Sequence, residues 1–579
     1  MAAFALHTNA ADILVSPTGN DSCDGITKPV ATLTMALRKV RETRRLKDSA
    51  DTGNMTIHLQ RGTYYIYEPV FVRPEDSGTK IIGDDDVVIS GGVRLCGWKK
   101  EGKLWVAEVP DFNAKPFDFR QLWINGRKAD RARDVQNFEK MFRILSVDKA
   151  KQMIWVPKKA VEKVLHSPYT EMILHEMWCV ANLRIKSITV QGDSAGISFH
   201  NPESRIQFEH PWPSPMVTED GTHNSPFYLA NAIELLDTEG EWYHDIRTGK
   251  LYYYPRKDED MTKAETIVPA IETLIQITGT LDNPVHDVSF CNIHFEHTTW
   301  MRPSYYGHVP LQAGMYLIDG YKLEPKMIRD HGNHKLDNQG WLGRAAAAVQ
   351  IENTKGIDFK GCAFRHLGGS GLDYITGNMG GTADSCTFTD IAMNGYVAGS
   401  FSPTGLETHQ PYNPQDKREV CTEQTISNSI FTDVTNEDWG CVAIAAGYVA
   451  GINICSNDIS EISYTGISLG WGWTRTPNCM HDNRVYGNKI HHYAKHMYDT
   501  AGIYTLGAQQ GTVISNNAVY GIYSPSYVHD PQHWFYLYTD EGSSGITIKD
   551  NYTESEKYLK NANGPGNIWE NNGNKVRFK

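Results

Sequence analysis

The sequence predicts an all-β protein whose main body is a right-handed parallel β-helix (a solenoid), with an N-terminal capping helix and an inserted β-domain. A short apolar motif recurs eight times in the second half of the chain, and the last four copies share an asparagine at intervals of 31, 29 and 34 residues. The composition agrees, because 50 Gly, 29 Tyr and 14 Trp with only 21% charged residues are typical of β-rich proteins rather than helical ones.

The repeated motif is an apolar residue, two polar or small residues, then Asn, Cys or Ser, one further residue and a second apolar residue. Its copies are Phe290–Phe295, Phe359–Phe364, Ala383–Phe388, Ile426–Phe431, Ile454–Ile459, Val485–Ile490, Ile514–Val519 and Ile548–Thr553; the first and last are loose, with Ile293 and Thr553 off the pattern. Stacked parallel strands place equivalent residues about 4.8 Å apart, so buried asparagines can hydrogen-bond along the stack. Asn457, Asn488, Asn517 and Asn551 should therefore form an internal column, one per solenoid coil.

Residues 33–46 predict a helix with an apolar face that includes Leu33, Leu37 and Val40 and ends at Leu46. This helix should cover the open end of the solenoid, where a terminal coil would expose apolar interior and strand edges. We expect residues 1–110 to hold this cap and the first coils. Longer, more polar segments predict an inserted β-rich domain over 111–269, and the main β-helix with its cleft should occupy 270–579.

A second set of elements should stack as one sheet face, namely Gly371-Leu372-Asp373, Gly440-Cys441-Val442, Gly466-Ile467-Ser468, Gly502-Ile503-Tyr504 and Tyr536-Leu537-Tyr538. Alternation along a strand points the last residue of each triplet outward. We expect a binding cleft between this face and the loops that hold Trp300, His331–Trp341 and Glu407.

The loops beside this face are rich in carboxylates, imidazoles and aromatic rings, the groups that sugar chemistry uses. Rings offer flat faces to pyranose C–H groups, and glycosidic cleavage needs two carboxyl groups. The candidate substrate-binding residues are Glu541, Tyr504, Tyr538, Trp471, Trp473, Tyr464, His496, Glu407, His409, Asp373 and Trp300. Trp471 or Trp473 should form a platform for a sugar ring.

Two segments, MYDTAGIYTLGAQQGT at Met497–Thr512 and YTDEGSSGI at Tyr538–Ile546, resemble the paired signature of glycoside hydrolase family 141. Weaker matches, such as GEWYHDIRTGKLYYYP at Gly240–Pro255, extend the resemblance nearly end to end. It implies a secreted β-helix hydrolase of plant cell-wall glycans, pectic or hemicellulosic, with α-L-fucosidase and xylanase activities in the family. The family's catalytic carboxylates match Asp499 and Asp540, whereas Thr500-Ala501 and Tyr536 stand where the family pattern has glycines.

Asp499 and Asp540 also lie at the two ends of the presumed cleft strand, and on straight strands the seven residues between their positions would span roughly 23 Å. This wide separation favours a water between the acids and inversion at the anomeric carbon. A glycosidase acid must stay protonated near neutral pH, so one of the two should have a raised pKa. Glu541 is the reserve candidate.

Three other functions remain as alternatives to an α-L-fucosidase: a xylanase or β-xylosidase-type hydrolase, a polysaccharide lyase, and a non-catalytic glycan-binding β-helix. A lyase of this fold would favour Lys or Arg bases, and here Arg475 and Lys495 are the only nearby cations. The partner should be an oligosaccharide or polysaccharide; the oligomeric state is not predicted.

Several other classes are disfavoured. A net charge of −12 and a pI near 6.0 argue against a nucleic-acid partner. No CxxC pair is present, and His492 and His496 lack a recognisable third ligand, so we expect no metal and no cofactor. No apolar run is long enough for a membrane span, and residues 1–11 lack the regions of a full signal peptide. We therefore expect a secreted or periplasmic protein whose signal peptide is absent from this sequence.

Overall fold

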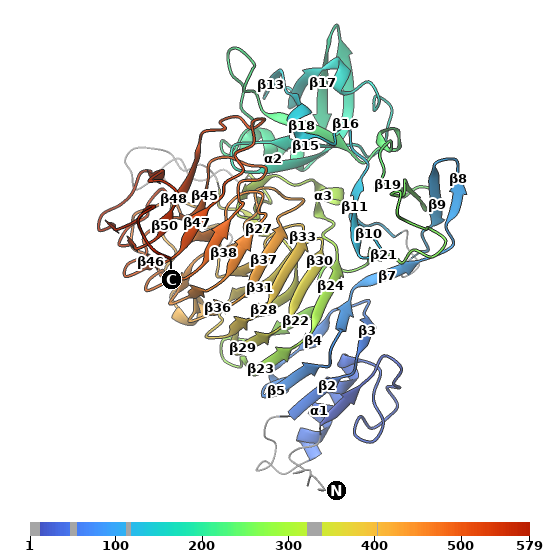
Figure 1. The fold of residues 1–579 in the computed structure, drawn as a ribbon, viewed down its shortest axis with the longest axis vertical. Helices are drawn as coiled ribbons and strands as arrows, with labels where there is room; N and C mark the ends of the chain where they lie inside the picture. The colour runs from blue at the N-terminus through green and yellow to red at the C-terminus, as the bar shows by residue number, and fades with distance from the viewer. Residues whose placement is uncertain are drawn as a thin grey trace.

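The computed structural model describes residues 12–46, 55–111, 117–320, 339–401, 403 and 405–578, and its main body is a parallel β-helix (Figure 1). Each coil visits three parallel sheets in turn, which we label A, B and C. The predicted fold class is confirmed by this arrangement. Among the described residues, no helix is long and apolar enough to cross a membrane.

Sheet A has 12 strands and sheets B and C have 10 each. Sheet A contains β1 (Ile13–Val15), β2 (Met55–Leu59), β5 (Thr79–Gly83), β23 (Val285–Cys291), β29 (Thr354–Lys360), β32 (Thr382–Asp384), β36 (Thr425–Ser427), β40 (Asn453–Cys455), β43 (Arg484–Tyr486), β46 (Val513–Ser515), β49 (Thr547–Lys549) and β52 (Ile568–Glu570). Sheet B contains β3 (Gly62–Tyr65), β6 (Val87–Ser90), β24 (His294–Thr298), β30 (Ala363–Leu367), β33 (Thr387–Ile391), β37 (Ile430–Val434), β41 (Asp458–Ser460), β44 (Lys489–His491), β47 (Ala518–Tyr520) and β50 (Tyr552–Thr553). Sheet C contains β4 (Val70–Val72), β22 (Ile275–Thr278), β28 (Ala347–Glu352), β31 (Ser370–Thr376), β34 (Tyr396–Ala398), β38 (Ile444–Ala446), β42 (Ile467–Leu469), β45 (Thr500–Thr505), β48 (Trp534–Thr539) and β51 (Tyr558–Lys560).

The repeated motif forms the corner between sheets A and B. The first apolar residues of all eight copies are in register along sheet A, from Phe290 to Ile548, and the closing residues are in register along sheet B, from Phe295 to Thr553. One sequence pattern therefore sets the register of two sheets at once.

The asparagine column is confirmed. Asn488 Nδ2 donates to Asn517 Oδ1 at 2.9 Å, and Asn488 Oδ1 accepts from the main-chain nitrogen of Asn457 at 3.0 Å and from Asn457 Nδ2 at 2.9 Å. The same bonds link Asn517 to Asn551, and Asn572 adds a further rung. Because these side chains are buried, the column satisfies polar groups at each corner that would otherwise be left unpaired.

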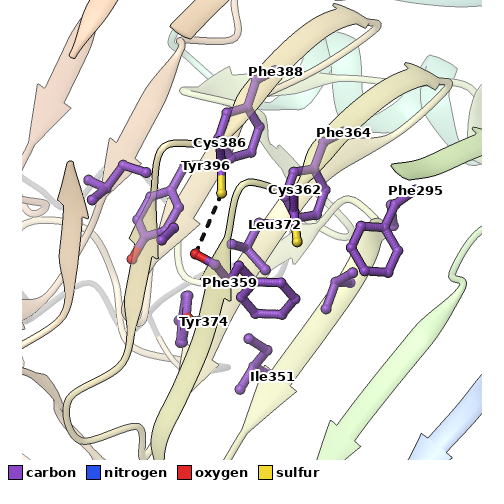
Figure 2. Close-up of a cluster of buried hydrophobic side chains, with 14 of the residues drawn as sticks. Phe295, Ile351, Phe359, Cys362, Phe364, Leu372, Tyr374, Cys386, Phe388 and Tyr396 are labelled. Carbon is purple, nitrogen blue, oxygen red and sulfur yellow. Dashed lines mark hydrogen bonds between the residues drawn. The ribbon is translucent and has the colours of Figure 1, made fainter. Parts of the chain in front are cut away.

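In the coils that precede this column, the interior is filled by stacked rings and thiols (Figure 2). The Phe364 and Phe388 rings stack with centroids 4.8 Å apart, and Phe388 stacks on Phe431 at 4.3 Å. Cys362 and Cys386 occupy motif positions that later become asparagine, and both are buried free thiols. Their packing role agrees with the small buried side chain that the repeat requires.

One set of predicted face elements is wrong. In sheet C, Leu372 pairs with Tyr396, which pairs with Ile444, which pairs with Ile467. Gly440-Cys441-Val442 therefore does not belong to the stack; the strand in that coil begins at Ile444, and the Tyr396 strand was missed. The error arose because Gly440-Cys441 has the expected Gly-apolar pattern but lies just upstream of the strand. In the strand itself, Ala443 stands where the other copies have glycine.

The inserted domain consists of two antiparallel-rich sheets of eight and seven strands that lie beside the solenoid (Figure 1). The first contains, in spatial order, β7 (Gly92–Leu95), β21 (Thr266–Pro269), β10 (Leu122–Ile124), β11 (Arg127–Arg131), β19 (Glu241–Asp245), β20 (Lys250–Tyr253), β9 (Leu104–Glu108) and β8 (Lys99–Glu101). The second contains β12 (Phe142–Arg143), β18 (Pro226–Ala230), β15 (Glu171–His175), β16 (Val180–Gln191), β17 (Ser194–Phe199), β14 (Met153–Pro157) and β13 (Ser146–Asp148). These sheets begin at residue 92, upstream of the expected start at 111, because β7 pairs with β21.

Short elements complete the fold. Helix α1 (Leu33–Leu46) packs Leu37 and Val40 against the first coil, and Thr32 Oγ1 caps it by accepting from the nitrogen of Met35 at 3.1 Å. Leu46, expected on the apolar face, is exposed at the last residue of the helix. The remaining elements are α2 (Glu203–Glu209), α3 (Arg302–Tyr306), the sheet of β25 (Pro310–Gln312), β26 (Met315–Leu317) and β27 (Leu342–Arg344), and the pair β35 (Cys421–Thr422) and β39 (Val449–Ala450).

Candidate active site

The candidate catalytic acids flank two neighbouring strands of sheet C. Tyr504 on β45 and Tyr538 on β48 are register partners, and their rings meet edge to face with centroids 4.9 Å apart. Asp499 directly precedes β45, whereas Asp540 directly follows β48. The two acids thus lie at opposite ends of two neighbouring strands of sheet C.

Asp499 is held by both its main chain and its carboxylate. Its backbone is left-handed, with φ +54°, and its nitrogen donates to the carbonyl oxygen of His533 at 2.6 Å. Its carboxylate pairs with His533 Nε2 at 3.0 Å, and its carbonyl oxygen accepts from the Tyr464 hydroxyl at 2.9 Å. The hydrogen bond to Asp499 raises the pKa of His533 above its usual value.

Asp540 lies in a contrasting environment, with its side chain almost wholly removed from solvent. Its Oδ2 accepts from the Tyr504 hydroxyl at 2.5 Å and its Oδ1 accepts from Asn561 Nδ2 at 2.7 Å. Burial raises the pKa of Asp540 to about 7, and the charges of Asp499 and Glu541 act in the same direction against the two hydrogen bonds. A carboxyl group with this pKa retains a proton near neutral pH.

Asp499 and Asp540 are close enough to interact electrostatically, although they lie at opposite strand ends. The charge of Asp499 contributes to the raised pKa of Asp540. Burial raises the pKa of Tyr464 and of Tyr538, and both carboxylates add to the effect on each phenol. The side chains therefore converge on these tyrosines, which the straight-strand separation did not anticipate.

The other candidates on this face differ in accessibility. Tyr464, Tyr504 and Tyr538 are buried side chains between the two acids. Glu541 is partly exposed, and its carbonyl oxygen accepts from the nitrogen of Gly507 at 3.1 Å. These four stay candidates for substrate contact.

The platform role expected of Trp471 is contradicted by its position. Its side chain is fully buried, with its ring edge to face against Trp473 at 5.1 Å and Phe401 at 5.0 Å. A sugar cannot stack on a ring whose faces are covered by protein. Trp473 is 9% exposed and its platform role stays a prediction.

Three other candidate side chains have structural partners that account for them. The buried Glu407 carboxylate pairs with the His409 ring at 3.0 Å, and Asp373 is buried and held at two oxygens by Arg344. All three side chains are buried and already paired inside the protein, so a sugar hydroxyl cannot reach them from solvent. We therefore correct the expectation that Asp373, Glu407 and His409 bind substrate directly.

Trp300 and His496 lie in other settings. Trp300 packs against His308 and Tyr316 in a small separate cluster, away from the two acids. The His496 ring stacks on Trp439 with centroids 4.2 Å apart, and burial lowers its pKa to about 3. Of the loop expected over the cleft at His331–Trp341, residues 331–338 lie outside the described residues.

The sequence did not single out His533 and Asn561, the direct partners of the two acids. His533 ends a polar loop and Asn561 lies in a turn of Asn and Gly, where such residues are common for backbone reasons alone. Among the residues that the structure describes, no group of three or more His, Cys, Asp or Glu side chains is arranged to hold a metal ion. The absence of a metal stays a prediction.

Comparisons with known proteins show the class of enzyme to which this β-helix with its paired acids belongs. A family model described as the GH141 insertion domain matches residues 102–256. A solved structure named as a glycoside hydrolase is 61% identical, covers 98% of this chain and 97% of its own, and superposes with a TM-score of 0.95. The chain belongs to glycoside hydrolase family 141.

More distant comparisons add nothing to the argument about activity. The structure of XylC with xylose is 11% identical, covers 95% of this chain and 70% of its own, and has a TM-score of 0.49. No curated protein sequence matches the chain significantly. The membership shows a hydrolase that acts on a glycan; the sugar and the linkage are matters for the proposal below.

Proposed function

We propose that this glycoside hydrolase is an α-L-fucosidase acting on a pectic or hemicellulosic glycan of the plant cell wall, with Asp499 and Asp540 as its catalytic pair. The specificity is supported by the family, which includes α-L-fucosidases. The roles are supported by one observation: the buried Asp540 has a pKa of about 7, while the Asp499 carboxylate is paired with His533. Such divergent environments separate an acid from a base.

In the proposed reaction Asp540 is the general acid. Its carboxyl proton passes to the glycosidic oxygen as the bond from that oxygen to the anomeric carbon breaks. The Asp499 carboxylate, which is paired with His533, takes a proton from a water molecule that attacks the anomeric carbon from the opposite face. The products are the free sugar with inverted configuration and a free hydroxyl group on the remaining glycan.

Tyr504 and Asn561 are positioning residues in this scheme. Each occupies one oxygen of Asp540, which fixes the direction in which the carboxyl group faces. Asp540 must be protonated before bond cleavage and ionised after it. The Tyr504 hydroxyl and the Asn561 amide favour the ionised form, so they oppose the effect of burial and keep the pKa near the working pH.

The proposal is tested with 4-nitrophenyl α-L-fucoside, the corresponding β-xyloside, and defined pectic and hemicellulosic oligosaccharides. Release of fucose supports the specificity, and release of xylose alone contradicts it. NMR of the first product anomer decides between inversion and retention. Asp499→Asn and Asp540→Asn should each lower turnover by at least roughly 100-fold with folding intact.

Glu541→Gln is the matched control, since Glu541 adjoins Asp540 in the chain. If Glu541→Gln abolishes turnover while Asp540→Asn leaves it near normal, the acid has been misassigned. A plant cell-wall substrate also implies a secreted or periplasmic location, which fractionation of the producing cells would test.

A further inference from the structure

A cavity of about 560 Å³ lies between the inserted domain and the β-helix. The insertion contributes residues of β11, β15, β16 and β18, and the solenoid contributes the carboxyl ends of sheet B strands and the turns that follow them, including Asp390, Asp433 and His496. Its volume is within the range of about 300–1,000 Å³ of small-molecule sites. Neither Asp499 nor Asp540 lines it, so it is separate from the carboxylate pair.

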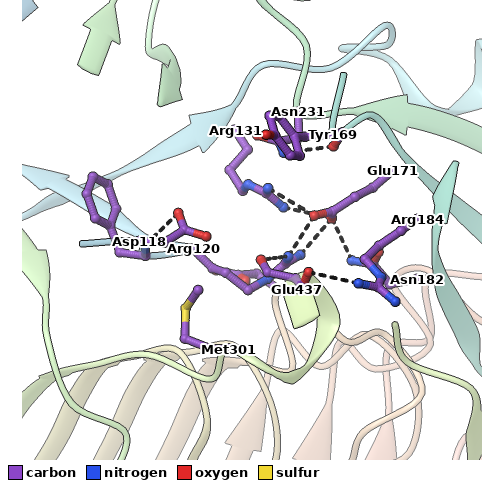
Figure 3. Close-up of polar contacts among 12 residues, drawn as sticks. Asp118, Arg120, Arg131, Tyr169, Glu171, Asn182, Arg184, Asn231, Met301 and Glu437 are labelled. Atoms are coloured by element: carbon purple, nitrogen blue, oxygen red, sulfur yellow. Dashed lines mark hydrogen bonds and ion pairs between the residues drawn. The ribbon is translucent and has the colours of Figure 1, made fainter. Parts of the chain in front are cut away.

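One wall of the cavity is a rigid network of ion pairs (Figure 3). The Glu171 carboxylate accepts from Arg120 at 2.8 and 2.9 Å and from Arg131 at 2.8 and 3.1 Å. Asn182 Nδ2 donates to the same carboxylate at 3.0 Å. Because Glu171 and Arg120 are buried, this wall is held in place before any ligand arrives.

The charges that line the cavity are balanced. Arg120 and Arg131 share Glu171, and Lys128 pairs with Glu437 at 2.5 Å and Asp390 at 3.6 Å. The other two lining cations are Arg133, paired with Asp130, and Lys495, paired with Glu461. Each cation that lines the cavity thus has an acidic partner already, so an anionic ligand would have to displace one. The balance favours a neutral ligand.

The side chains that line the cavity provide both donors and acceptors of hydrogen bonds. The guanidinium groups of Arg131 and Arg133 donate, and the carboxylates of Asp433 and Glu461 accept. Hydroxyl groups both donate and accept, which makes a polyhydroxylated ligand the matching chemistry.

The cavity also has an aromatic side. The partly exposed ring on this side is that of Phe138, which meets the buried Trp439 edge to face at 4.8 Å and His496 at 5.3 Å. Tyr228 lines the cavity next to them. Rings beside polar side chains provide the two kinds of contact that a sugar ring makes, one apolar and one hydrogen-bonding.

We propose that this cavity is a binding subsite for a neutral sugar unit of the glycan, distinct from the site of bond cleavage. The inference rests on the proposed function for the connection to substrate, but the binding itself does not require that the fucosidase assignment hold. The inserted domain would then contribute to recognition of the glycan beyond the cleaved sugar.

The test measures binding by calorimetry with the Asp540→Asn protein, which should not consume the ligand. The probes are neutral oligosaccharides from xyloglucan and xylotetraose, with tetragalacturonate as the acidic counterpart. Arg133→Met, added to this background, removes the guanidinium donor group from the cavity wall. Arg133→Lys removes the same donor but keeps a cation for Asp130, which guards against failure to fold. Arg127→Met is the matched control, since Arg127 lies on the same β11 strand but does not line the cavity.

We expect at least one neutral oligosaccharide to bind, with a Kd raised 10-fold or more by both Arg133 variants and unchanged by Arg127→Met. Equal binding by the Arg133 variants, tighter binding of tetragalacturonate, or no binding of any neutral probe would overturn the proposal. In the active protein, the Arg133 variants should raise KM for oligosaccharides but leave kcat/KM for the aryl fucoside unchanged. Neutral binding without fucoside cleavage would refute the specificity while the subsite stands.

Discussion

Replacing Asp540 by asparagine should stabilise the protein while it removes activity. The substitution keeps the shape of the side chain and cannot ionise. Asn561 can still donate to the amide oxygen, and the Tyr504 hydroxyl can turn to accept from the amide nitrogen. What changes is the free energy of keeping a carboxylate in a buried position.

The magnitude follows from the pKa of Asp540. Burial raises it to about 7, against 3.8 for an unperturbed aspartate, a difference of about 3. Each pKa unit corresponds to about 1.36 kcal/mol, so the ionised Asp540 costs about 4 kcal/mol of folding free energy. Because the folded pKa is the higher one, the protein loses this stability as pH rises from about 4 to about 7, and the loss is complete above pH 7. The asparagine variant lacks this loss.

Urea unfolding of both proteins at several pH values between 4 and 8 measures the effect. The advantage of Asp540→Asn should be small at pH 4 and grow to the order of 4 kcal/mol by pH 8. If the two proteins show the same dependence on pH, Asp540 does not have a raised pKa and the proposed acid is wrong. In the unsubstituted enzyme, kcat/KM should fall tenfold per pH unit above about pH 7, as the acid loses its proton.

Three further outcomes follow from the contacts. Asp499→Asn should lower the pKa of His533 toward its usual value, because the imidazolium loses its carboxylate partner; NMR titration of the ring checks this. Asn488→Ala should lower the free energy of unfolding by about 3 kcal/mol or more, since it leaves several buried polar groups of the column unpaired; urea unfolding measures the loss. Arg344→Met should cost about 3–5 kcal/mol by leaving Asp373 unpaired, with kcat of the folded protein unchanged.

Each of these outcomes has a clear contrary result. An unchanged histidine titration would mean that the pair at Asp499 does not form in solution. A loss well below 1 kcal/mol for Asn488→Ala would mean that water satisfies the column. A large fall in kcat for Arg344→Met, measured on protein that is folded, would return Asp373 to the list of substrate contacts.

The solenoid could be predicted because its signals are local and repeated. Each copy of the motif fixes one corner through side chains that are close in sequence, and stacking repeats the same environment every coil. The in-register pairing of the eight copies and the asparagine column both follow from that repetition. The strand at Ile444 could not be predicted, because it lacks the glycine that precedes the other strands of the set and so shows no periodic signal.

The accessibility of the candidate site residues could not be predicted in the same way. Trp471 and Asp373 have the residue types of a sugar-binding face, yet Phe401 covers one and Arg344 pairs with the other. Those partners come from different coils and loops. A composition rich in carboxylates and aromatics shows which groups are available, but not which are already engaged within the protein.

By itself, the sequence determined the repeat and its register, and it singled out Asp499 and Asp540 as candidate acids. Only the tertiary structure decided that one acid is buried against Tyr504 and Asn561 while the other is paired with His533, and that the insertion closes a charge-balanced cavity against sheet B. The physical reason is the distance along the chain over which each property is set. Strand periodicity depends only on residues that are neighbours in sequence. Burial and electrostatic fields, in contrast, sum over all groups near in space, whatever their distance along the chain.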